Sequence, residues 1–110
     1  MRFDASLTKD NHSKICALMD AAFPTDFESM LVSKLRADEA LAAEHGLWDS
    51  DTLVGYIAYS TVQIENLATA QVIMGLGPMA ISPKLQGRGI GLELLKTSIV
   101  TIKADAIILL

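Results

Sequence analysis

Apolar residues recur along the chain with two different periods, and the change of period separates helices from strands. Residues 9–23 have the period of a helix, because apolar side chains return at intervals of three, four and seven positions. The apolar residues of this segment are Ile15, Leu18, Met19 and Ala22. Pro24 follows directly and is expected to end this helix.

A second helix is predicted over residues 26–37. Thr25 and Glu28 have the spacing of a capping box, in which each side chain bonds to the other residue's backbone N–H. We expect an apolar stripe to be buried on this helix, formed by Phe27, Met30, Leu31 and Leu35.

The remaining patterned segments predict strands. A short first strand is expected within residues 2–7, and residues 41–48 and 53–64 flank the turn-rich tetrapeptide 49–52 like the arms of a hairpin. Residues 54–59 are apolar on both faces, which predicts an interior strand. Further strands are expected over 71–81 and, buried and parallel to it, over 106–110.

Between these last two strands lies a glycine-rich loop followed by a helix. The helix is expected to begin between residues 89 and 92, to bury Leu92, Leu95, Ile99 and Ile102, and to expose Glu93, Lys96 and Lys103. Gly87, Gly89 and Gly91 stand on alternate positions at its start. Helix N-termini and glycine-rich turns bind anions through free N–H groups, and Arg88 could add a charge-assisted bond. Close packing at a helix entrance is the alternative explanation for the glycines.

Two other phosphate-binding loops do not fit these residues. No Gly-Lys-Ser/Thr triplet follows the glycines, which argues against a nucleotide triphosphatase. Gly75-x-Gly77-x-x-Ala80 matches the dinucleotide-binding expression, but it lies inside an apolar strand and no helix follows it directly. Gly77-Pro78 is better interpreted as a bulge or bend in that strand.

Residues 79–91, Met-Ala-Ile-Ser-Pro-Lys-Leu-Gln-Gly-Arg-Gly-Ile-Gly, resemble the acetyl-coenzyme A signature of the GCN5-related N-acetyltransferase (GNAT) family. Gln86, Gly89 and Gly91 occupy its Gln/Arg-x-x-Gly-x-Gly/Ala positions. The resemblance implies that the coenzyme's pyrophosphate contacts Gln86, Gly87, Arg88, Gly89, Ile90, Gly91 and Leu92. It implies that the pantetheine arm contacts Met79, Ala80 and Ile81.

The resemblance also implies the fold. The predicted order β-α-α-β-β-β-α-β matches the first two thirds to three quarters of the α/β acyl-CoA N-acyltransferase (GNAT) fold, a mixed sheet with helices on it. Family members normally continue with a helix and two strands, so we expect residues 1–110 to be one GNAT-like domain, incomplete at its carboxyl terminus. Such an end would expose strand 106–110 as an edge, which predicts a homo-oligomer, and specifically a dimer, through that strand.

Composition and charge limit the kinds of molecule that the chain is expected to bind. The chain of 110 residues is 51% hydrophobic and carries a net charge of −4, with no basic cluster, which argues against nucleic acid and anionic membranes as partners. No signal peptide or membrane-spanning run is found, and the expected location is the cytoplasm. One cysteine and two histidines predict no metal site, with Cys16 as a packing thiol and His12 and His45 as surface or capping residues.

The resemblance implies an acetyl-CoA-dependent N-acetyltransferase acting on a primary amine of a small molecule or a protein. The alternatives are a non-catalytic acetyl-CoA-binding module and an oligomerising remnant of the fold. An amine must lose a proton before it attacks, and Glu44 and Glu65 are weak candidates for the base. In the family, the acid is often a tyrosine beyond the last strand of this chain, so the catalytic residues stay unassigned.

Overall fold

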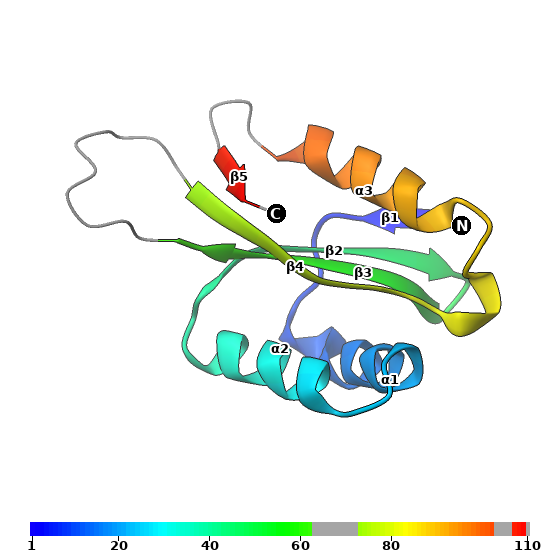
Figure 1. Cartoon of the computed structure of the whole chain (residues 1–110), viewed down its shortest axis with the longest axis horizontal. Helices are drawn as coiled ribbons and strands as arrows, with labels where there is room; N and C mark the ends of the chain where they lie inside the picture. Colours follow the sequence, from blue (N-terminus) through cyan, green and yellow to red (C-terminus); the bar gives the residue numbers. More distant parts are fainter. Residues whose placement is uncertain (63–72, 103–106, 110) are drawn as a thin grey trace.

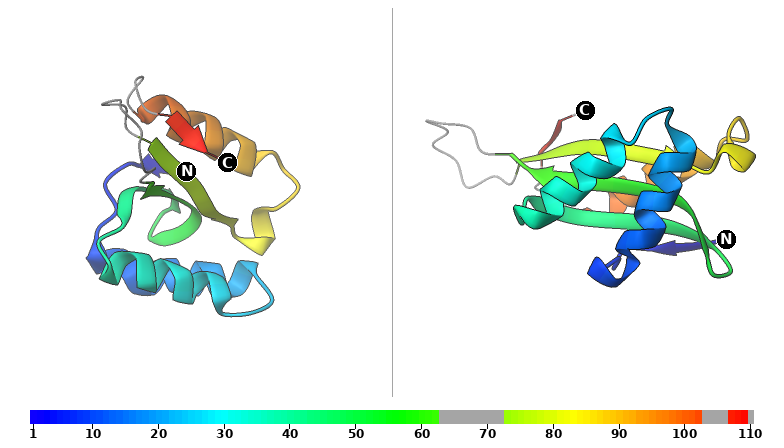
Figure 2. Two further views of the ribbon diagram at one scale, coloured as in Figure 1. Left: turned by 60° about the vertical axis from the view of Figure 1, so that its left-hand side comes forward. Right: turned by 90° about the horizontal axis from the view of Figure 1, so that it is seen from below.

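A five-stranded sheet in the order β1-β2-β3-β4-β5 forms the centre of the computed structural model, which describes residues 1–62, 73–102 and 107–109. Helices α1 and α2 cover one face of the sheet and α3 covers the other (Figures 1 and 2). The strands are β1 Arg2–Asp4, β2 Leu41–Asp49, β3 Thr52–Thr61, β4 Ile73–Ile81 and β5 Ile107–Leu109. The helices are α1 His12–Ala22, α2 Phe27–Ala37 and α3 Ile90–Thr101, with 3₁₀ turns η1 Lys9–Asn11 and η2 Pro83–Leu85. The predicted order of elements is confirmed.

Neighbouring strands pair in chain order. β1 to β4 are antiparallel to one another, and β5 is parallel to β4. The predicted interior strand is confirmed, because every residue of β3 from Leu53 to Tyr59 is buried. Parts of three predicted strands, residues 63–64, 71–72, 106 and 110, lie outside the described residues.

A bulge occurs in β4 at the predicted place. Ile57 pairs with Met79, but Tyr59 pairs with Leu76, so two steps along β3 correspond to three along β4. The additional residue falls at Gly77-Pro78, where proline offers no N–H to the ladder. The dinucleotide-like glycine pattern is therefore part of a bulged strand.

Helix α1 buries the face that its periodicity predicts. Ile15 and Met19 are fully buried and Leu18 nearly so. They belong to a cluster with Tyr56 and Ala80 on the same face of the sheet.

Helix α2 differs from the prediction. Phe27 and Met30 are 65% and 62% exposed and Leu31 is also exposed, whereas Ser29 and Val32 are buried. The inward face carries polar contacts: the Ser29 hydroxyl donates to Asp20 of α1 at 2.6 Å. Of the predicted stripe only Leu35 is partly buried, so the predicted face is wrong for Phe27, Met30 and Leu31. Polar contacts to α1, which the apolar spacing does not reveal, help to orient the helix.

The capping box predicted at Thr25 and Glu28 is also wrong. Thr25 Oγ1 accepts from the Phe27 N–H at 3.3 Å, but the Asp26 position caps α2 without a side-chain bond. Glu28 Oε2 is buried and has no hydrogen-bond partner among the described residues. A capping box forms instead at the start of η1, between Thr8 and Asn11.

Helix α3 is likewise turned away from its predicted face. Leu94 and Ser98 are buried at 2% and 0% exposure, whereas Leu92 is 55% and Ile99 is 38% exposed. Leu95 and Ile102 are partly buried. Glu93 and Lys96 are exposed as predicted, and Lys103 lies outside the described residues.

Candidate functional site

The loop that connects β4 to α3 contains two glycines in the left-handed region. Gly87 has φ +80° and Gly89, the N-cap of α3, has φ +78°. A Cβ added at either position would meet no protein atom within 4 Å. Backbone conformation, and not crowding, therefore favours glycine at these two positions.

Gly91 plays a different part. It is the second residue of α3, and an added Cβ would lie 3.4 Å from Ile81 and 3.7 Å from Met79, which is ordinary contact distance. Packing therefore brings the first turn of α3 against the end of β4. The amides of this first turn lack partners within the helix, so the turn is suited to bind an anion.

Gln86 joins the loop to the strand that precedes it. Its side-chain amide donates to the backbone oxygen of Ile81 at 3.0 Å. Gln86 and Arg88 are both exposed. The side chain of the signature glutamine thus fixes the loop against the end of β4, and its backbone N–H donates to the Pro83 oxygen at 3.5 Å.

One edge of β4 is free where the predicted contacts lie. β5 pairs only with Ile73–Gly75 of β4, and no described strand continues that pairing toward Ile81 (Figure 1). On the other side the Ser82 N–H donates to Val54 at 2.8 Å. In an antiparallel ladder alternate residues bond to the partner strand, so Ala80 bonds to β3, and the N–H and C=O groups of Met79 and Ile81 point toward the free edge.

The structure thus brings the two predicted groups of site residues together. Met79–Ile81 lead along the free edge directly into the loop and the first turn of α3. The predicted residues also differ in accessibility, since Ala80 is buried while Leu92 is largely exposed.

Glu44, a candidate base, lies in a buried network. Its carboxylate accepts from the Arg36 guanidinium at 2.8 Å and from the Tyr56 hydroxyl at 2.7 Å. Burial, followed by the hydrogen bond to Glu44, raises the pKa of Tyr56 well above its usual value. Glu44 therefore connects α2 to the sheet and is a poor candidate for a proton acceptor, and Glu65 lies outside the described residues.

His45 is not the surface or capping residue that was expected. It is 3% exposed, and its Nδ1 lies 2.6 Å from the Ser98 hydroxyl, which in turn lies 2.7 Å from the Tyr59 hydroxyl. Burial lowers the pKa of His45, partly opposed by the charge of Asp4, and raises the pKa of Tyr59. The sequence offers no signal for this cluster, because its members are contributed by β2, β3 and α3.

His12 and Cys16 lie together between α1 and α2. His12 is half-buried, with Nε2 3.2 Å from the Ser33 hydroxyl and 3.5 Å from Cys16 Sγ. Cys16 is also half-buried between the helices, which agrees with a packing role.

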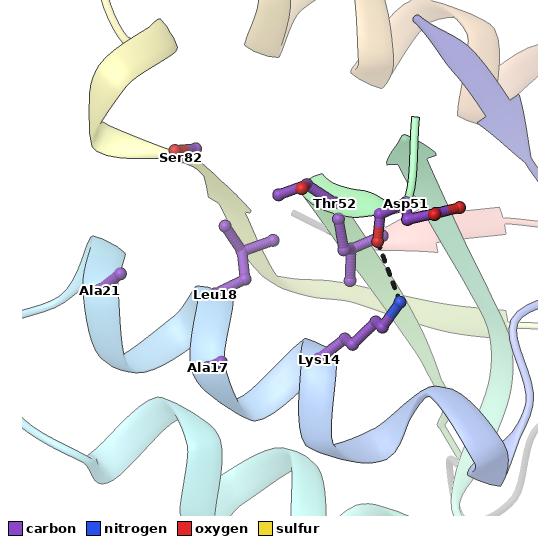
Figure 3. A pocket seen from close by; sticks show the side chains of 8 residues that line it. Lys14, Ala17, Leu18, Ala21, Asp51, Thr52 and Ser82 are labelled. Atoms are coloured by element: carbon purple, nitrogen blue, oxygen red, sulfur yellow. Dashed lines mark hydrogen bonds between the residues drawn. The ribbon is translucent and has the colours of Figure 1, made fainter. Parts of the chain in front are cut away.

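A hollow of about 360 Å³ opens on the α1 side of the sheet (Figure 3). Leu18 and Ala21 of α1 line it together with Asp51 and Ser82, and Lys14 donates to the Asp51 backbone oxygen at 2.9 Å. Its lining includes none of the predicted coenzyme contacts, although Ser82 directly follows β4.

Two further observations concern metals and membranes. The described part of the chain contains no group of three or more side chains able to hold a metal ion. Within residues 1–62, 73–102 and 107–109, no helix has both the length and the apolar character needed to cross a bilayer.

Comparisons with known proteins agree with this geometry. The model of the acetyltransferase (GNAT) family matches residues 12–109. A GNAT family acetyltransferase from Brucella melitensis, solved in complex with acetyl-CoA, is 27% identical with a TM-score of 0.79; the match covers 91% of this chain and 66% of that one. The N-acetyltransferase YhbS from Escherichia coli, solved in complex with CoA, is 26% identical with a TM-score of 0.79, over 91% of this chain and 54% of that one.

A more distant structure shows the same fold. The ribosomal-protein-alanine N-acetyltransferase of Brucella melitensis biovar Abortus is 13% identical with a TM-score of 0.71, over 98% of this chain and 79% of that one. A comparison with curated proteins found no match. The chain spans about two thirds and about half the length of the first two relatives. The family match over residues 12–109, together with the observed order of strands and helices, shows that the chain belongs to the acetyltransferase (GNAT) family.

Proposed function

We propose that the chain binds acetyl-CoA along the free edge of β4 and at the start of α3, and that it transfers the acetyl group to a primary amine. The observation that carries this proposal is the continuity of the edge at Met79–Ile81 with the two left-handed glycines of the loop. The two relatives solved with acetyl-CoA and CoA support it.

The residues fit the coenzyme in two places. Free amides of Met79 and Ile81 can bond to the amide groups of the pantetheine arm as a further strand would. Within the predicted segment Gln86–Leu92, the residues after Gln86 offer N–H groups to the pyrophosphate without a Cβ at Gly87 or Gly89 in the way, whereas the Gln86 N–H donates to the Pro83 oxygen. Arg88 is exposed and can approach the phosphates from the rim.

The acceptor must reach the thioester as a neutral amine. An alkylammonium group has a pKa near 10.4, so it must first lose a proton. Whichever N–H of Met79 or Ile81 is not bonded to the pantetheine arm is suited to stabilise the oxyanion that forms when the amine attacks. Because Glu44 is held by Arg36 and Tyr56, we assign no side chain as the base.

Isothermal titration of the 110-residue chain with acetyl-CoA tests the binding step. We expect a stoichiometry near one per chain, with CoA competing for the same site. No measurable heat at high coenzyme concentration, confirmed by an unchanged melting temperature, would contradict the proposal.

Glu44 is bonded to Arg36 and Tyr56 and is therefore not free to act as the base. This observation favours a second candidate function, a module that binds acetyl-CoA without catalysis. Thiol release in the presence of a panel of primary amines separates the two functions. Amine-dependent release supports the transferase. Stoichiometric binding without release supports the module.

We also propose that the chain forms a homodimer through β5. This strand pairs with β4 on one side only among the described strands, and Leu109 is 45% exposed. An edge of this kind can pair with another copy. Sedimentation should show a mass that rises with concentration, and Leu109→Lys should shift the equilibrium to monomer; a concentration-independent monomer would exclude the dimer.

A further inference from the structure

The rotation of α3 about its own axis is not the one that its apolar residues favour. Leu92, Leu95, Ile99 and Ile102 form a continuous stripe, yet Leu94 and Ser98 face the sheet. At about 100° per residue, the stripe is offset from the buried face by roughly a quarter turn. A quarter turn toward the stripe would bury Leu92 and Ile99 and would expose Leu94, so burial of apolar area alone favours a rotation closer to the stripe than the one observed.

A buried polar cluster accounts for the observed rotation. Ser98 Oγ lies 2.6 Å from His45 Nδ1 and 2.7 Å from Tyr59 Oη. His45 is 3% exposed, and Ser98 and Tyr59 are fully buried. One hydroxyl can donate to one of these partners and accept from the other, so every polar atom of the contact is paired.

Turning α3 by a quarter turn would separate Ser98 from both partners. Three polar groups would then be left without partners inside the protein, and such groups cost free energy when they remain buried. The cluster therefore restricts α3 to one rotation even though the apolar stripe stays partly exposed. Polar contacts in a core commonly specify one arrangement among several of similar packing.

The surroundings of the cluster make it a structural contact and not a reaction site. The imidazole of His45 is contacted edge-on by Phe3 and Tyr59, with ring centroids 5.4 and 5.6 Å away. Although serine and histidine lie at hydrogen-bond distance, the Ser98 hydroxyl has no exposed surface. A substrate carbonyl cannot reach it in this conformation.

We propose that Ser98 is a positioning residue for the coenzyme site. By fixing the rotation of α3, it sets where the free N–H groups of the first turn lie around the helix axis relative to the free edge of β4; this turn begins after the N-cap Gly89, nine residues before Ser98. This inference rests on the proposed coenzyme site, but the rotation itself can be measured without coenzyme.

Thiol labelling measures the rotation. In a Cys16→Ala background, Ile99→Cys places a thiol on the partly exposed stripe, and Val100→Cys places one at a position that is 80% exposed. Val100 is a matched control, because a quarter turn toward the stripe leaves it in solvent. Adding Ser98→Ala should slow labelling at position 99 by about tenfold, corresponding to about 1.4 kcal/mol of protection, and should leave position 100 unchanged.

Coenzyme titration measures the consequence. Ser98→Ala should weaken acetyl-CoA binding by about tenfold. The triple variant Ser98→Ala, His45→Leu, Tyr59→Phe removes the polar groups together, so it should recover stability without recovering affinity. If Ser98→Ala alone does not fold, the labelling and the titration can be carried out on this triple variant instead.

Each outcome decides one part of the inference. Unchanged labelling at position 99, in both the single and the triple variant, overturns the control of rotation. Slower labelling with unchanged affinity overturns the positioning role, as does recovery of affinity together with stability in the triple variant. If the parent chain binds no coenzyme, the proposed function fails, and with it the positioning role, while labelling still decides the rotation.

Discussion

At the scale of single residues, identical amino acids in this chain have different reasons for being where they are. Gly89 is favoured by its φ of +78°, whereas Gly91 lies within the helix in ordinary contact with β4. The sequence shows the alternation of glycines but not which of them has a left-handed backbone. That distinction depends on where α3 begins, and residue spacing locates a helix start only within a few positions.

Substitutions at Gly89 should separate backbone strain from blocking of the coenzyme. Asparagine tolerates the left-handed region, so Gly89→Asn should cost little stability, whereas Gly89→Val should cost about 1–2 kcal/mol. Both side chains would project into open space beside the loop, so both should weaken acetyl-CoA binding at least about tenfold. Urea unfolding and calorimetry provide the two measurements; wild-type affinity in Gly89→Asn would remove this glycine from the site.

The buried imidazole of His45 should make stability depend on pH. Its folded-state pKa is lowered by burial from the ordinary value of 6.5. Below that value the unfolded chain binds a proton that the folded chain does not, so stability should fall as the pH drops through 6.5 toward the lower folded pKa.

His45→Gln keeps a polar side chain at this position but cannot titrate. In this variant the urea midpoint should change less with pH over the same range than it does in the parent chain. The measurements must stay above pH 3.8, the ordinary pKa of an aspartate. The pKa of Asp4 is lowered from this value, chiefly by the Ser6 backbone hydrogen bond, so the contribution of Asp4 to stability is lost as the pH falls below it. Identical slopes in the two proteins would rule out His45 as the source.

At the scale of elements, the sequence predicts which segments are helices but misjudges which faces of two helices are buried. α1 follows its apolar spacing, and its buried residues were predicted correctly. In α2 and α3, contacts of Ser29, Arg36 and Ser98 decide the rotation, and each depends on a partner from another element. Apolar periodicity contains no information about such partners.

The ion pair between Arg36 and Glu44 should be the strongest of these contacts. Both side chains are largely buried, at 13% and 12% exposure, so Glu44→Ala leaves a buried guanidinium without its carboxylate and should cost about 3 kcal/mol. Lys34 and Asp38 form an exposed pair on the same helix, and Asp38→Ala should cost less than about 1 kcal/mol. Chemical unfolding measures both losses; equal losses would mean that burial does not strengthen the Arg36–Glu44 contact.

At the scale of the whole molecule, the sheet separates two apolar clusters, one under α1 and α2 and the other under α3. The order of elements, the hairpin and the interior strand could be predicted because each follows from a local pattern. The free edge of β4 could not be predicted in this way, because it exists only where β5 stops pairing with β4, after Gly75. The resemblance implied contacts at Met79–Ile81, and those contacts stay a prediction.

Hydrogen exchange across the whole chain should show on which side of the sheet the coenzyme acts. Acetyl-CoA should slow exchange at Met79 and Ile81 and in the first turn of α3, because these amides would gain bonding partners. Exchange in α1, whose cluster lies on the opposite face, should change little. Protection confined to α1 and the hollow beside Ser82 would instead place the ligand on that other side.

The pairing of β1 with the middle of the chain has a consequence for the order of folding. β2, β3 and β4 are successive neighbours in the chain, whereas β1 pairs Arg2 with Trp48, and both α1 and α2 lie between these two residues in the sequence. Contacts between residues far apart in sequence close larger loops and form more slowly. Trp48 is the only tryptophan, and its indole N–H donates to Asp4 at 3.0 Å, so its fluorescence is a natural reporter of the moment at which the first strand joins the sheet.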